Sequence, residues 1–270
     1  LEDSINRIKD IDLIKQYIIS LGSTTTTHRA KNTKGDGIRT EEVLLSFTWQ
    51  RDNDTTLRLF TDAYIQNSIE TTDASKASKV NYDVQTGVGA SRKFYKTLYL
   101  GTEIKYTYNA VLLPDFSAEF NAGYKVSRIF DLVGMYRFTY DRIDSYETDK
   151  RPVSHILAPG AVLYFTPRLY LRGQCYIDTN LKNYMLSGFT DLTAEPSPFD
   201  KIDIYGSYGK GRSVQTYGTI WTNVDVMTMG LAAAYTHYFN STFGLAGNIS
   251  WTKNRWDTAL GFGLQAELRL

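Results

Sequence analysis

Apolar and polar residues alternate one by one along most of this chain, and this period of two constrains the fold more than any other feature. In the C-terminal stretch "TALGFGLQAELRL", the even positions from Leu260 to Leu270 hold leucine, phenylalanine and alanine. The odd positions between them hold glycine, glutamine, glutamate and arginine. Neighbouring side chains of an extended chain point to opposite faces, so this stretch is predicted to be a strand with one apolar face.

The same alternation recurs from residue 23 to the C-terminus. It is clear in "VLLSFTWQ" (43–50), "LRLFTDAYIQ" (57–66), "VNYDVQTGVGA" (80–90), "LYLGTEIKYTYNA" (98–110), "FSAEFNAGYKV" (116–126), "YRFTYDR" (136–142), "LYLRGQCYIDT" (169–179) and "FGLAGNISW" (243–251). Along the chain, short turns such as "RDND" (51–54) alternate with longer polar loops such as "NSIETTDASKAS" (67–78). The pattern predicts an all-β, closed, antiparallel, up-and-down transmembrane barrel of about 14 strands, within a range of about 12–16.

The first residues have a different period. Isoleucines recur at three- and four-residue steps from Ile5 to Ile18, and Gly22 follows. This spacing predicts a short amphipathic helix over residues 1–22, with the barrel over 23–270. The apolar stripe of such a helix needs a partner. The helix is therefore either packed on the barrel as a plug or the last helix of a preceding helical domain.

A membrane barrel explains the alternation better than a soluble β-sandwich or propeller. A closed sheet of this size has a lumen too wide to be filled as a dry core, so its polar face lines the lumen and its apolar face meets lipid. The aromatic load of 20 Tyr, 13 Phe and 4 Trp fits the aromatic girdles of such barrels. Trp49, Tyr106 and Tyr164 are girdle candidates near predicted strand ends. We expect the barrel to contact outer-membrane lipid.

The C-terminal "GLQAELRL" resembles the last strand of Gram-negative outer-membrane β-barrels, although it ends in Leu270 where that family usually has an aromatic residue. A helix that leads into a barrel, together with the glycine- and tyrosine-rich "IDIYGSYGKGR" (202–212), resembles YaiO-type barrels and tetratricopeptide-linked exopolysaccharide export barrels. The resemblance implies location in the bacterial outer membrane, with the C-terminus in the periplasm. It also implies polysaccharide export and a periplasmic helical-repeat domain or partner proteins.

The polar faces of the predicted strands carry charges of both signs. We expect the lumen to be lined by Arg58, Lys105, Lys125, Arg137, Arg172, Arg269, Asp62, Asp83, Glu103, Glu119, Asp141, Asp178, Asp203 and Glu267. A pore selective for one ionic sign carries a ring of one charge. The mixed set instead indicates either cross-strand ion pairs that partly close the barrel or a path for a neutral or weakly charged polymer.

Aromatic residues share these polar faces. The candidates are Phe60, Tyr64, Tyr99, Tyr170, Tyr176 and Tyr205. Their rings could stack on sugars, or they could simply fill space in the lumen.

The sequence does not indicate catalysis or a cofactor. Of the three histidines, His28, His155 and His237, only His155 adjoins a serine, and adjacent residues of a strand point to opposite faces. The single cysteine, Cys175, rules out an internal disulfide and a cysteine metal cage. A formal net charge of +1 does not indicate the positively charged surface that nucleic-acid binding requires. We expect no enzyme activity, no cofactor, no metal and no nucleic-acid partner.

Three functions remain open at this point. The first is a porin-like translocation pore for polysaccharide or another polar solute. The second is a closed structural barrel that anchors a partner complex at the outer membrane. The third is surface recognition through the long loops, as an adhesin or a phage receptor.

Overall fold

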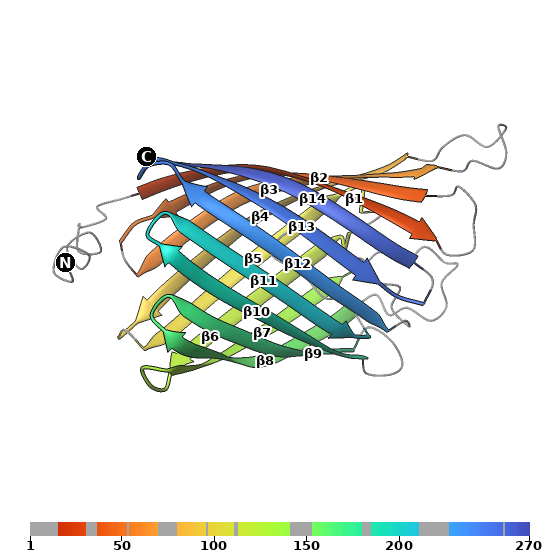
Figure 1. The fold of residues 1–270 in the computed structure, drawn as a ribbon. Coiled ribbons are helices and arrows are strands. Elements are labelled where there is room, and N and C mark those ends of the chain that lie inside the picture. Colours follow the sequence, from red (N-terminus) through yellow and green to blue (C-terminus); the bar gives the residue numbers. More distant parts are fainter. Residues whose placement is uncertain are drawn as a thin grey trace.

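The computed structural model describes residues 16–30, 37–52, 54–69, 80–95, 97–110, 113–140, 153–179, 185–210, 227–255 and 257–270. Fourteen strands form a closed antiparallel barrel (Figure 1). The strands are β1 (Gln16–Ala30), β2 (Gly37–Gln50), β3 (Thr55–Ile69), β4 (Val80–Phe94), β5 (Leu98–Tyr108), β6 (Phe116–Lys125), β7 (Phe130–Tyr140), β8 (Val153–Thr166), β9 (Leu169–Asp178), β10 (Met185–Ser197), β11 (Asp200–Gly209), β12 (Thr228–Tyr238), β13 (Phe243–Lys253) and β14 (Asp257–Arg269). The predicted fold class and strand number are confirmed.

The barrel closes between its first and last strands. The β1–β14 pairing runs from Ile18 opposite Arg269 to Ala30 opposite Asp257. It extends by two further bonds, from the Tyr17 N–H to the Leu270 carbonyl (2.9 Å) and from the Leu270 N–H to the Tyr17 carbonyl (2.8 Å). Closure leaves no strand edge with unpaired backbone groups, which is the condition for a sheet to stand in lipid.

The predicted N-terminal helix is wrong over residues 16–22, which form the first half of β1. The segment lies between two strands, with Ile18 opposite Thr48 of β2 and Arg269 of β14. As a strand, this segment pairs with the facing edges of β2 and β14, whereas a helix would satisfy only its own backbone and leave both edges open. The rest of the expected helix, residues 1–15, lies outside the described residues. Among the residues described, no helix is long and apolar enough to cross a membrane.

The longer connections all lie at one end of the barrel and the other end has only short turns, as the sequence predicts, although the brief β13–β14 connection (254–256) lies at the long-connection end. The ends of β1 and β14 that carry Gln16 and Arg269 lie at the short-turn end (Figure 1). In the turn between β2 and β3, the Asp52 carboxylate accepts hydrogen bonds from the N–H groups of Asp54 (2.8 Å) and Thr55 (2.6 Å). These bonds favour the charged form and hold the pKa of Asp52 below its ordinary value.

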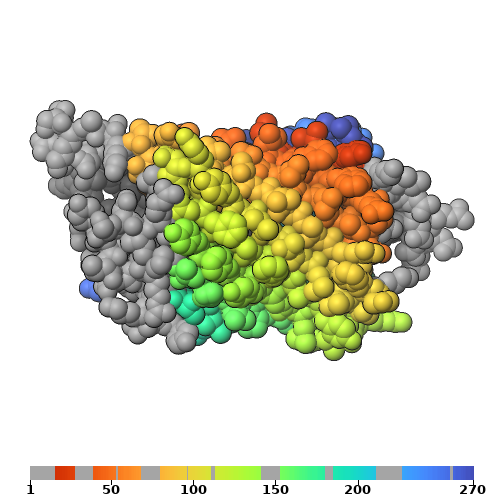
Figure 2. Space-filling model, turned by 180° about the vertical axis from the view of Figure 1, so that it is seen from behind, coloured from red at the N-terminus to blue at the C-terminus, as the bar shows by residue number. Residues whose placement is uncertain are grey.

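Large apolar side chains cover the outside of the barrel. Exposed examples spread over the strands are Leu21, Leu45, Leu59, Val88, Ile104, Leu132, Leu157, Leu186, Ile204, Leu231, Ile249, Phe262 and Leu264, the last being 74% exposed. The outer wall seen in Figure 2 is a continuous surface of packed side chains from orange to green strands. An apolar surface that extends around the whole molecule is far larger than soluble monomers expose, so it requires a lipid-like surrounding.

Inside the barrel, a glycine makes room for an aromatic ring. Gly87 of β4 lies opposite Phe60 of β3, and a Cβ atom at Gly87 would lie 2.2 Å from Cζ of Phe60. The Phe60 ring therefore packs against the β4 backbone at Gly87. The Arg58 guanidinium carbon is 4.8 Å from the ring centroid and the Lys105 ammonium 5.4 Å from it. Gly87 thus sets the position of a ring that two cations contact.

We predict that Gly87→Ala destabilises the barrel by about 1–3 kcal/mol, because the Phe60 ring must leave its place. Gly134→Ala is the matched control, since a Cβ there meets no atom within 4 Å. Denaturant unfolding of the refolded barrel measures both. The cost of Gly87→Ala should shrink in a Phe60→Leu background, and equal costs for the two alanine variants would contradict the packing argument.

Candidate functional site

The inner surface of the barrel has two unlike walls. Inward-facing residues of β12, β13, β14 and β1 are mostly small and uncharged, including Ala232, Ala234, Thr236, Ala246, Ser250, Thr252, Ala259, Gly261, Gly263, Ser20, Gly22 and Thr24. Inward-facing residues of β3 to β10 include most of the charged and aromatic side chains. Selective contacts inside the barrel therefore come mainly from this β3–β10 wall, together with Glu42 of the adjoining β2.

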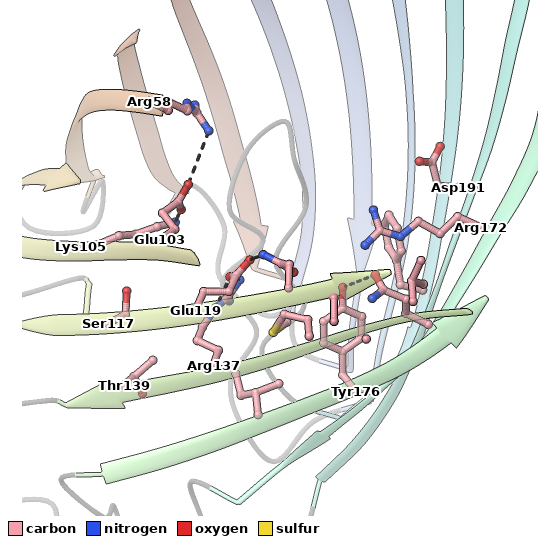
Figure 3. Close-up of a pocket in the computed structure, with 18 of the residues that line it drawn as sticks. Arg58, Glu103, Lys105, Ser117, Glu119, Arg137, Thr139, Arg172, Tyr176 and Asp191 are labelled. Carbon is pink, nitrogen blue, oxygen red and sulfur yellow. Dashed lines mark hydrogen bonds and ion pairs between the residues drawn. The ribbon is translucent and has the colours of Figure 1, made fainter. Parts of the chain in front are cut away.

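A cavity of about 760 Å³ lies against the β3–β10 wall. Of the charged residues expected in the lumen, those that line it are Arg58, Asp62, Glu103, Lys105, Glu119, Arg137 and Arg172. The expected aromatic residues that line it are Phe60, Tyr64, Tyr99, Tyr170 and Tyr176. Tyr205 is buried beside Phe189, with ring centroids 6.0 Å apart, and does not line the cavity. Figure 3 shows how these side chains converge from different strands.

The other expected lumen residues lie away from this cavity. Asp83, Asp178 and Asp203 are buried in the wall, and Asp203 accepts a hydrogen bond from Thr193 at 2.7 Å and pairs with Lys201 at 2.9 Å. Lys125, Glu267 and Arg269 lie at the short-turn ends of β6 and β14, where Arg269 Nε donates to Glu267 at 2.7 Å. Asp141 lies outside the described residues.

Several cavity residues were missed at the level of sequence. Glu42 of β2 lines the cavity and accepts a hydrogen bond from the Tyr64 hydroxyl at 3.0 Å. Its place one residue before the apolar run "VLLSFTWQ", on the parity opposite to Val43, was an available signal. Asp191 and Phe189 belong to β10, where alternation in the sequence is weakest. Tyr164, expected in a girdle, instead points inward and donates to Asp131 at 2.9 Å.

Most charges of the cavity are paired within the wall. Glu103 contacts Lys105 at 2.7 Å and Arg58 at 3.7 Å. Arg137 holds Glu119 through two guanidinium nitrogens, with Nε at 2.8 Å, and both side chains are less than one fifth exposed. Asn121 also donates to Glu119, at 2.8 Å. The dashed lines in Figure 3 mark these contacts. The wall therefore neutralises much of its own charge.

Two features narrow the lumen. A buried cluster from β7 to β12 packs along the inner wall and consists of Met135, Ile156, Ala158, Tyr176, Phe189, Tyr205, Ala232 and Ala234. At the long-connection end, residues 113–115 form a segment before β6 that lies against the inside of the barrel. Leu113 of that segment is 7% exposed, lines the cavity, and donates its backbone N–H to Asp83 at 2.7 Å. The cavity is thus bounded toward that end by a tethered segment.

The histidines whose side chains are described lie outside the cavity. His155 is on the outer face, with Nδ1 2.7 Å from the Tyr136 hydroxyl. His237 is at the short-turn end, with Nδ1 2.8 Å from Asp200. The side chain of His28 is outside the described part. Within that part, no three His, Cys, Asp or Glu side chains are placed to hold a metal ion.

Comparisons with known proteins show the fold. No family model matches the sequence, and no curated protein matches it. The crystal structure of the Pseudomonas putida toluene transporter TodX superposes with a TM-score of 0.62 at 8% identity, over 95% of this chain and 90% of that one. A Pseudomonas aeruginosa FadL homologue gives 0.60 at 9% identity, over 95% and 90%. The translocator domain of the autotransporter NalP from Neisseria meningitidis gives 0.51 at 8% identity, over 100% and 93%.

These likenesses support the predicted outer-membrane-type barrel. The finer resemblance to YaiO-type and polysaccharide-export barrels stays a prediction, because identities of 8–9% carry the architecture and nothing beyond it.

We predict that Arg137→Met and Glu119→Gln each destabilise the barrel by about 3 kcal/mol, because each leaves a mostly buried partner without its counter-charge. The double variant should lose less than the sum of the two. The matched pair is Arg39→Met and Glu41→Gln, whose ion pair of 2.7 Å lies on the outside and is more exposed. Unfolding of all variants in the same detergent measures the coupling, and equal couplings for the inner and outer pairs would contradict the prediction.

Proposed function

We propose that this chain is a translocation pore of the bacterial outer membrane that passes polar solutes without net charge. The observation that carries the proposal is a polar cavity inside a closed, externally apolar barrel. Its charges are of both signs and largely paired, so it lacks the single-sign ring of an ion-selective pore. The short-turn end, with the C-terminus, would face the periplasm, as in barrels of this type.

Polysaccharide export is the finer form of this proposal. It is supported by the tyrosines that line the cavity, namely Tyr64, Tyr99, Tyr164, Tyr170 and Tyr176, since such rings can stack on sugars. A periplasmic helical-repeat partner would belong to the same system.

The second candidate is a closed barrel that anchors a partner complex. It is favoured by the buried inner cluster around Tyr176 and Phe189 and by the inward segment tethered at Leu113. Such a barrel would conduct little and would co-purify with its partner.

A pair of cysteine variants separates the two candidates. In a Cys175→Ser background, Val133→Cys places a thiol in the cavity lining, and Leu132→Cys places one on the apolar outside of the same strand. We expect stepwise conductance in planar bilayers, reduced by a charged, water-soluble thiol reagent only for Val133→Cys.

If barrels whose folding is confirmed by heat-modifiable gel mobility showed no conductance, that result would favour the anchoring role. Equal modification of both thiols would contradict the assignment of inner and outer faces.

A further inference from the structure

The cavity contains two charged side chains with unmet hydrogen-bonding capacity. Among its described lining residues, only Asp62 and Arg172 carry a buried side-chain polar atom without a hydrogen-bond partner. The atoms are Oδ1 of Asp62 and Nε of Arg172. Buried polar atoms are normally satisfied, so each unsatisfied one calls for a physical reason. The two atoms are themselves buried in the wall, but the two side chains that carry them are opposite in charge and line the same cavity.

Asp62 forms the acidic pole. It is 8% exposed, and Glu42 on the adjacent strand adds a second carboxylate to the same part of the lining. The nearby cations are Arg58 and Lys105, and both contact Glu103 instead. A cationic group entering the cavity would therefore find two carboxyl groups that form no ion pair within the described residues.

Arg172 forms the basic pole. It lies opposite Asp191 in the β9–β10 register, and the two opposite charges attract each other, but within the described residues they are too far apart to form an ion pair. The other cations of the lining, Arg58, Lys105 and Arg137, all have carboxylate partners. Figure 3 shows the Arg172 guanidinium reaching into the space between the strands. Among the described cations of the lining, Arg172 is the one that forms no ion pair.

The two poles are far apart. In a barrel of fourteen strands, β3 and β9 are six strands apart and face each other across the lumen. Strand spacing of about 4.8 Å and a tilt of about 40° put such facing backbones roughly 27 Å apart. Both side chains reach inward, which shortens this distance. Asp62 is in the middle of β3 and Arg172 is near the short-turn end of β9, which offsets them along the barrel. The charged groups are therefore separated by roughly 15–20 Å. A free amino acid is far too short to touch both.

We propose that the cavity binds a short peptide in an extended conformation, with its ammonium group at Asp62 and Glu42 and its carboxylate at Arg172. An extended chain of about five residues spans the gap at about 3.4 Å per residue. The neutral amide of Asn121 lies in the same lining and can meet a peptide group. The inference deepens the proposed function, because a zwitterion has no net charge.

Calorimetric titration of the refolded full chain with the peptide Gly-Ser-Gly-Ser-Gly tests the proposal. Its N-acetylated and C-amidated forms each lack one terminal charge. We expect each blocked form to bind about tenfold more weakly, since each loses one charge-assisted contact. Free glycine should bind more weakly still, because its charges cannot reach both poles. If the wild-type chain bound the free and the blocked peptides with equal affinity, that result would overturn the proposal without any variant.

Two substitutions assign the poles. In Arg172→Gln, amidation should no longer weaken binding while acetylation still does, and Asp62→Asn should show the reverse. Arg39→Gln and Glu41→Gln, which change the same charge types on the outside, should leave both effects in place. Binding that is indifferent to Asp62→Asn and Arg172→Gln would overturn the proposal.

Failure of this inference and of the proposed pore can be told apart. A folded barrel that binds the peptide but does not conduct would refute the pore and support the site. A barrel that conducts but does not distinguish the free peptide from its blocked forms would refute the site alone.

Discussion

The rest of the structure depends on the hydrogen bonds between β1 and β14. They turn a sheet with two open edges into a barrel with none, so that no backbone group is left facing lipid. Once the barrel is closed, parity alone decides which side chains face outward and which face the lumen. The apolar exterior and the polar interior follow from that single constraint.

Closure also creates an interior that side chains must fill or line. Fourteen strands enclose more space than a ring of inward side chains can fill as a dry core. The protein fills part of it with an apolar cluster around Tyr176 and Phe189, and lines another part with ion pairs such as Glu119–Arg137. The remaining cavity is polar and nearly balanced in charge. This balance is the reason for preferring solutes without net charge over ions of one sign.

Most charged side chains of the cavity form ion pairs, so the few that do not are the candidates for binding a solute. Glu103 engages two cations and Glu119 engages a third, so these charges stabilise the wall and are less available to a solute. Asp62 and Arg172 each keep a side-chain polar atom without a hydrogen-bond partner, and the two residues lie on opposite sides of the lumen. The cavity therefore has an acidic and a basic side even though its net charge is small, and an elongated zwitterion complements it better than a simple ion does.

The sequence by itself determined the fold class, an approximate strand number and the face on which most residues lie, because the period of two can be read directly from residues such as Leu260 to Leu270. It misled at residues 16–22, where isoleucine spacing suited a helix and only pairing with β2 and β14 selected a strand. It placed Arg58, Asp62 and Arg172 on the inner parity but could not say which of them are paired. That depends on contacts between strands far apart in the chain, which only the closed tertiary structure brings together.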